Sequence, residues 1–147
     1  MKGAAEMKGL NIPVGVSDFE KIRSNGYYYI DKSGLIGELL RTGAEVTLIT
    51  RPRRFGKTLG MSMLEKFFDI RKDSRELFEG LEISERQDLC SKWMNQWPTV
   101  FLSLKSVDGL NFEGAYQQLV YEISLLYQKH DYLLESTALS EQDKFLF

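Results

Sequence analysis

The residues best suited to chemistry lie in one segment, Arg51-Pro52-Arg53-Arg54-Phe55-Gly56-Lys57-Thr58. It ends in Gly-Lys-Thr, as does the Walker A pattern G-x-x-x-x-G-K-[ST], which joins a strand to a helix. In such a loop the glycine lets the backbone approach a phosphate, the lysine reaches the β- and γ-phosphates, and the threonine hydroxyl binds Mg²⁺. The segment therefore predicts ATP and Mg²⁺ binding, with Thr58 as the metal-binding hydroxyl. The expected phosphate contacts are Arg53, Arg54, Phe55, Gly56, Lys57, Thr58 and Leu59.

Two other interpretations of this segment stay open, because the first glycine of the pattern is replaced by Arg51. Arg51, Arg53, Arg54 and Lys57 could form a basic patch for the phosphates of a nucleic acid, which would make the chain a nucleic-acid-binding module. The segment could also be a solvated basic turn without a ligand. Dependence on Mg-ATP, as against dependence on salt, separates the first two interpretations.

The elements around the segment predict an α/β fold. Residues 45–50 form a short apolar run typical of a buried strand, and residues 99–104 form a second one. Residues 27–30 are rich in tyrosine and favour an accessory strand. We therefore expect the N-terminal part of a three-layer P-loop sandwich with an incomplete sheet.

Several helices are expected between these strands. One begins at Ser17 or Asp18, and another runs from Asp31 or Ser33 to about Gly43. A buried helix should follow the basic segment, and a further helix should cover residues 84–95, after an irregular stretch over residues 73–83. Asn111 is expected to cap a long amphipathic helix.

Several segments of the chain resemble the AAA-ATPase-like family, a bacterial group of predicted P-loop ATPases. They are Ile-Pro-Val-Gly-Val-Ser-Asp-Phe from residue 12, Gly-Tyr-Tyr-Tyr-Ile-Asp-Lys-Ser from residue 26, and Ile-Thr-Arg-Pro-Arg-Arg-Phe-Gly-Lys-Thr-Leu from residue 49. In that family an arginine-rich loop replaces the glycine entry, so Arg51 fits its pattern. We expect an N-terminal extension at residues 1–11, an accessory helix-strand-helix segment at 12–44 and a partial P-loop ATPase domain, truncated before Walker B, at 45–147.

An acidic Walker B strand, which members of this family carry downstream, is not evident in the sequence. Longer members often end in a restriction-endonuclease-like domain, and nucleic acid is a conceivable partner for such a parent protein. We therefore expect no catalytic residue here, and ATP hydrolysis only in a longer protein of which this chain would be a truncated part. Tyr29 and Asp31 are candidates for contacts beside the base, although Asp31 could instead cap the following helix or, less favourably, bind magnesium.

The composition is that of a soluble globular chain of 147 residues with a net charge of -2. With one cysteine and one histidine, an internal disulfide and a Cys/His zinc site are excluded. No run of 18 apolar residues suggests a membrane span, so a cytoplasmic location is expected. His130, Cys90, Trp93 and Trp97 are interpreted as packing residues.

The apolar strands and the long helix also predict association. A P-loop sheet has about five strands, whereas the sequence offers two convincing ones and residues 27–30. We therefore expect a homo-oligomer that covers the remaining edge and the apolar helix face.

Overall fold

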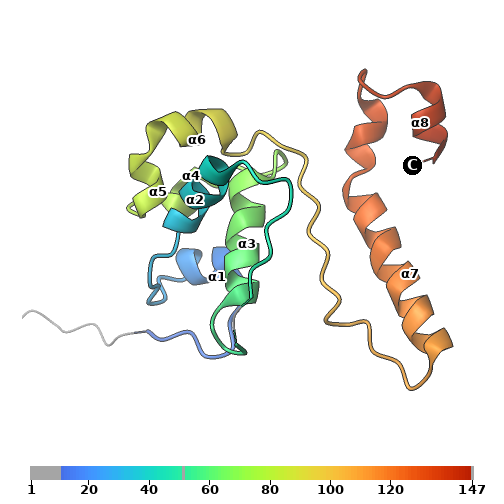
Figure 1. Ribbon diagram of the computed structural model, residues 1–147, viewed down its shortest axis with the longest axis horizontal. Coiled ribbons are helices and arrows are strands. Elements are labelled where there is room, and N and C mark those ends of the chain that lie inside the picture. Colours follow the sequence, from blue (N-terminus) through green and yellow to red (C-terminus); the bar gives the residue numbers. More distant parts are fainter. Residues whose placement is uncertain (1–10, 51, 147) are drawn as a thin grey trace, which may run out of the picture. The chain divides into compact units, whose positions relative to one another are not determined.

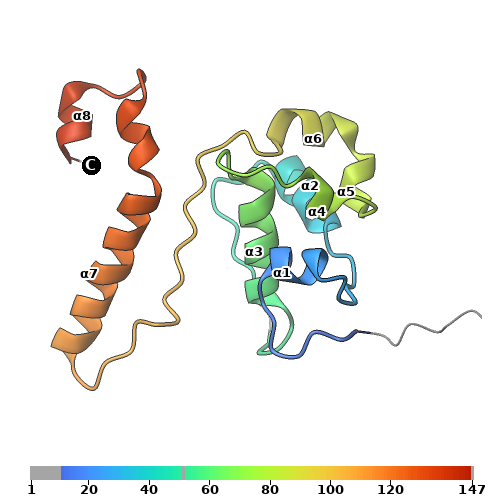
Figure 2. The same ribbon diagram turned by 180° about the vertical axis from the view of Figure 1, so that it is seen from behind.

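The computed structural model describes residues 11–50 and 52–146, so the expected N-terminal extension lies, apart from Asn11, outside the described residues. The chain divides into two compact units, Met1–Thr99 and Val100–Phe147, and each is described by itself. Figures 1 and 2 show that the described elements of both units are helices. The basic segment belongs to the first unit.

The expected α/β sandwich is wrong. No strand occurs in the described parts of the chain, where the one β-bridge is an isolated parallel pair between Asp69 and Trp97. The three segments expected as strands have no regular secondary structure, and several of their apolar side chains are exposed, with Val46 at 86% and Val100 at 66%. The reason is that apolar, β-branched residues make a strand only where a second backbone accepts and donates the ladder hydrogen bonds. Among the described residues, none of these segments pairs with another backbone in a β-ladder.

Helices α1 (Phe19–Ser24) and α2 (Gly34–Thr42) form close to where the sequence predicts them. The carboxylate of Asp18 accepts a hydrogen bond from the backbone of Lys21 and so caps α1. Helix α2 ends at Gly43, whose φ of 60° lies in the left-handed region that glycine adopts without strain. Local signals therefore determine both helices.

Helix α3 (Lys57–Phe68) carries the centre of the core. Met63 and Phe67 are fully buried and pack with Phe19 of α1 and with Phe78. Figure 1 shows α1 lying beside α3, and residue contacts between the two helices confirm it. The remaining buried members of this cluster are Ile36, Leu81 and Ile83.

Three short helices follow α3: α4 (Arg75–Phe78), α5 (Glu82–Glu85) and α6 (Gln87–Trp93). The sequence predicted an irregular stretch and then a single helix over residues 84–95, which is wrong. The break falls at Arg86, whose ψ of 70° is not helical. Near the end of the first unit, Trp97 stacks on Trp93 with ring centroids 5.3 Å apart.

The second unit contains α7 (Phe112–Lys129), the 3-10 helix η1 (Asp131–Glu135) and α8 (Glu141–Leu146). The Asn111 side chain accepts a hydrogen bond from the backbone of Gly114 at 2.9 Å, which confirms the predicted cap of the long helix. His130 is 4% exposed, in line with a packing role. Within the described residues, no helix is both long and apolar enough to cross a membrane.

Candidate functional site

The N-terminus of α3 is built by a glycine that no other residue type could replace without strain. Gly56 precedes the helix with φ 76° and ψ 22°, in the left-handed region, and Arg54 shares this sign with φ 69°. The first amides of a helix have no acceptor inside the helix. No side chain caps α3, and its first turn carries no acidic residue. The basic loop (residues 52–56) therefore leads into a helix end that attracts an anion.

Helix α3 is held firmly against α1, and this anchors the loop. The backbone of Phe19 donates to the buried Oγ of Ser62 at 3.1 Å. Lys66 donates to Glu20 at 2.6 Å. Burial alone would lower the pKa of Lys66, but the hydrogen bond and charge of Glu20 raise it above its ordinary value. The helix that carries the basic loop is thus fixed by both packing and polar contacts.

The side chains of the basic loop face solvent. Arg53 and Arg54 are exposed, and Phe55 is 59% exposed. The Nζ atom of Lys57 donates to the carbonyl oxygen of Pro52 at 3.4 Å, across the loop. Thr58 is also exposed, whereas Leu59 is half-buried against the core. Arg51 lies outside the described residues.

A cavity of about 560 Å³, which we call the loop cavity, joins most of the predicted phosphate contacts. On one side it is lined by Arg53, Arg54, Gly56, Lys57, Thr58 and Leu59. On the other side it is lined by Ile22 and by residues of the segment 13–17. The tertiary structure therefore places the segment 13–17 at the loop, a neighbour that the sequence did not predict.

A second cavity, of about 430 Å³, lies on the α2 side of the same glycine, and we call it the α2 cavity. Phe55, Gly56 and Lys57 line it together with Lys32 and Glu38. Lys32 is a residue that sequence reasoning missed. Its only sequence signal was its place in the Asp31-Lys32-Ser33 run of the family resemblance.

Tyr29 and Asp31, the predicted base-side contacts, line neither cavity. The Tyr29 hydroxyl lies 3.3 Å from Sδ of Met63, and burial raises its pKa. The Asp31 carboxylate accepts backbone hydrogen bonds from Ser33 at 2.8 Å and from Glu82 at 2.7 Å. Burial acts to raise the pKa of Asp31, but these bonds hold it below its ordinary value. In this structure Asp31 ties the start of α2 to the start of α5.

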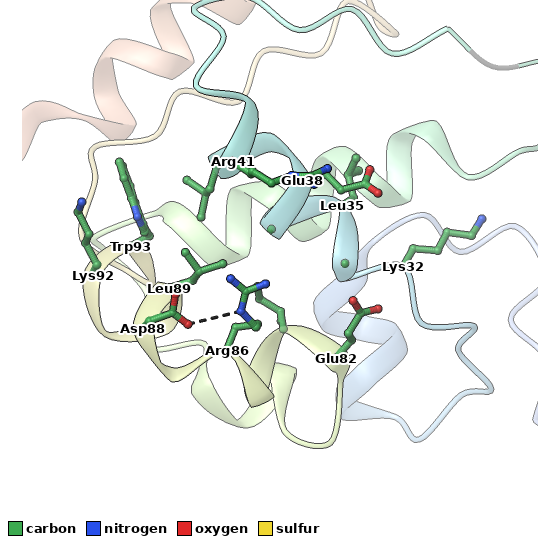
Figure 3. A pocket seen from close by; sticks show the side chains of 14 residues that line it. Lys32, Leu35, Glu38, Arg41, Glu82, Arg86, Asp88, Leu89, Lys92 and Trp93 are labelled. Carbon is green, nitrogen blue, oxygen red and sulfur yellow. Dashed lines mark ion pairs between the residues drawn. The ribbon is translucent and has the colours of Figure 1, made fainter.

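A larger cavity, of about 870 Å³, lies between α2 and the helices α5 and α6 (Figure 3). Its charged side chains are of both signs, and Arg86 pairs with Asp88 at 3.5 Å. It shares Lys32, Leu35 and Glu38 with the α2 cavity and no residue with the loop cavity. The predicted phosphate contacts are therefore concentrated in the two smaller cavities.

No solved structure matches the chain. A curated relative, described as "Uncharacterized protein in vnfD 5'region" from Azotobacter chroococcum mcd 1, is 33% identical over 118 residues. That match covers 78% of this chain and 21% of the relative, so the chain spans about a fifth of that protein's length. The model of the family described as "Predicted AAA-ATPase" matches residues 13–146. This match takes in the segment 13–17, the basic loop and all nine helices of the described residues. The chain therefore belongs to the predicted AAA-ATPase family.

Proposed function

We propose that this chain binds ATP, as the Mg²⁺ complex, with the triphosphate at the basic loop and the N-terminus of α3. The observation that carries the proposal is the left-handed Gly56 directly before Lys57 and Thr58 at an uncapped helix start. A glycine in this conformation, a lysine and a hydroxyl in that order are the parts a phosphate loop requires. Membership of a predicted ATPase family supports the same ligand class.

The residues present fit a triphosphate. The loop cavity of about 560 Å³ is lined by two arginines and one lysine, and no carboxylate of the described residues lines it. Lys57 donates to the carbonyl of Pro52 at a long 3.4 Å. A phosphate oxygen is a charged acceptor and would form a stronger bond with this ammonium than the carbonyl does. Binding would therefore give the Lys57 ammonium a charged acceptor.

Magnesium fits this site only as part of the nucleotide complex. No group of three or more His, Cys, Asp or Glu side chains in the described residues could hold a metal. The Thr58 hydroxyl would supply one ligand and the phosphates would supply others. Phosphoryl transfer also needs an acid that holds Mg²⁺ and a group that orients water. We therefore propose binding by this chain and assign no catalytic residue.

Calorimetric titration of the 147-residue chain with Mg-ATP tests the proposal. Lys57→Ala should weaken binding by a factor on the order of ten or more, because a charge-assisted hydrogen bond is lost. Lys72→Ala is the matched control, since Lys72 is exposed and follows the far end of α3. That end lies about 18 Å from the loop, as twelve residues at a rise of 1.5 Å each imply.

Equal affinities of the parent chain and Lys57→Ala, or no binding at millimolar Mg-ATP, would overturn the proposal. The alternative function predicts a different pattern, with DNA or RNA binding that weakens steeply with salt and requires no nucleotide. Titration of a DNA duplex at two salt concentrations distinguishes the two functions.

A further inference from the structure

We propose that Lys32 is a second phosphate-binding cation of this site, which reaches the basic loop from the start of α2. This inference rests on the proposed ATP binding. The Nζ atom of Lys32 lies 3.6 Å from the position that a Cβ atom on Gly56 would occupy. Apart from the atoms of Gly56 and its two chain neighbours, it is the one atom found within 4 Å of that position in the described structure. The glycine at the phosphate loop is thus faced by an ammonium group that lies 24 positions away in the sequence.

The backbone of Lys32 is held in place on both sides. Asp31 accepts hydrogen bonds from the backbones of Ser33 and Glu82, at 2.8 and 2.7 Å. Ser33 is fully buried, and its Oγ accepts from the backbone of Ile83 at 3.1 Å. Lys32 itself is exposed. Asp31 and Ser33 therefore fix the backbone on both sides of Lys32, while the side chain of Lys32 is exposed.

The charge of Lys32 is directed to the loop rather than to a nearby acid. In the part of the chain that the structure describes, Lys32 makes no ion pair. Figure 3 shows its side chain pointing away from the carboxylate of Glu82. Lys32, Gly56 and Lys57 line the α2 cavity together, and among the described residues Glu38 is the one acid in its lining. An anion bound in this cavity would be attracted by the positive charges of both lysines.

The expected ligand group is the phosphate chain rather than the nucleoside. A lysine acts on phosphate as a point charge and makes no selective contact to a base. Lys32 should therefore contribute equally to the binding of ATP and of inorganic tripolyphosphate. Because the side chain is exposed, we expect a loss of about tenfold in affinity on removal of the charge.

The test is calorimetric titration of the full chain and three variants with Mg-ATP and, separately, with tripolyphosphate. Lys32→Met removes the charge and keeps much of the length, Lys32→Arg keeps the charge, and Lys72→Met is the control for loss of one exposed lysine. We expect Lys32→Met to weaken both ligands about tenfold, while Lys32→Arg and Lys72→Met stay within about threefold of the parent. Thermal unfolding without ligand shows whether each variant folds like the parent chain.

Equal binding by Lys32→Met and Lys72→Met, in a chain that does bind Mg-ATP, would refute the role of Lys32 and leave the proposed function intact. A loss for Mg-ATP without a loss for tripolyphosphate would also refute it, because the contact would then be to the nucleoside. If Lys32→Arg loses as much affinity as Lys32→Met, or if Lys32→Met has a lower melting temperature than the parent chain, Lys32 has a structural role instead. No ATP binding by the parent chain would overturn the proposed function and, with it, this inference.

Discussion

The link that Asp31 makes between α2 and α5 leads to a quantitative prediction about stability. Its two oxygens accept one backbone hydrogen bond each, from Ser33 and from Glu82. Asp31→Ala removes both bonds and leaves two amide donors without this acceptor. Asp31→Asn keeps one acceptor oxygen and loses the charge, so it removes about half of the interaction.

The expected size follows from the exposure of this carboxylate. A hydrogen bond within a protein contributes about 0.5–1.5 kcal/mol to the free energy of unfolding, and more when it is charged and buried. Asp31 is exposed, and its bond to Glu82 lies at the surface. We therefore expect Asp31→Ala to lower the free energy of unfolding by about 2 kcal/mol and Asp31→Asn by about 1 kcal/mol.

Urea unfolding followed by tryptophan fluorescence measures these losses. Both tryptophans, Trp93 and Trp97, belong to the first unit, so their signal reports the unit that contains Asp31. A loss of 2 kcal/mol lowers the urea midpoint by about 1 M if the slope is about 2 kcal/mol per M. Asp73→Asn serves as the control, because Asp73 is an exposed aspartate for which no side-chain hydrogen bond is found in the described structure.

The pH dependence provides a second measurement on the same variants. The pKa of Asp31 is lower in the folded chain than its ordinary value, despite the opposing effect of burial. The stabilisation is therefore present above the ordinary aspartate pKa of about 3.9 and is lost as pH falls through the lower folded value. The difference in urea midpoint between the parent chain and Asp31→Asn should become smaller as the pH falls from about 4 to about 2. Equal midpoints for Asp31→Ala and Asp73→Asn at pH 7, or a gap that persists at low pH, would refute this reasoning.

Three further predictions concern the core and the C-terminal end of α3. Phe67→Ala should lower the free energy of unfolding by about 3–5 kcal/mol, because Phe67 is fully buried among aromatic rings; a loss below about 1 kcal/mol in urea unfolding would contradict this packing. Asn95 has a φ of 55° and hydrogen bonds to the carbonyls of Lys66 and Asp69, so both Asn95→Gly and Asn95→Ala should destabilise the first unit. Asn95→Ala should lower the free energy of unfolding by about 1 kcal/mol more than Asn95→Gly, because only alanine is strained in the left-handed conformation. Equal urea midpoints of the two variants would contradict this strain. Burial acts to raise the pKa of Asp69, but its hydrogen bonds from Arg71, one of them at 2.8 Å, hold the pKa below its ordinary value. Asp69→Asn should therefore lower the free energy of unfolding at pH 7, and by a smaller amount near pH 2. The urea midpoints of parent and variant at the two pH values measure both losses.

The sequence by itself determined the features that depend on near neighbours in the chain. Asp18 and Asn111 cap helices because a short polar side chain reaches an amide three positions ahead. Gly43 ends α2 because glycine adopts the left-handed conformation without strain. Gly56, Lys57 and Thr58 stand at a helix start for the same local reason, and the basic loop was recognised from their order.

Only the tertiary structure decided the features that need a distant partner. The segments 45–50 and 99–104 have the composition of strands, but a strand forms only when another backbone lies alongside, and composition cannot show that one does. The division of residues 84–95 likewise falls at the non-helical backbone of Arg86, which the sequence pattern does not reveal.

The candidate site shows the same division between local and distant effects. The sequence identified the loop, but it also predicted base-side contacts at Tyr29 and Asp31. In the structure Tyr29 contacts Met63, and Asp31 accepts a hydrogen bond from the start of α5. Lys32 was overlooked because its meeting with Gly56 depends on how α2 and α3 are packed in the first unit. A lysine on the surface looks the same in any sequence, and only the fold determines which group its charge will face.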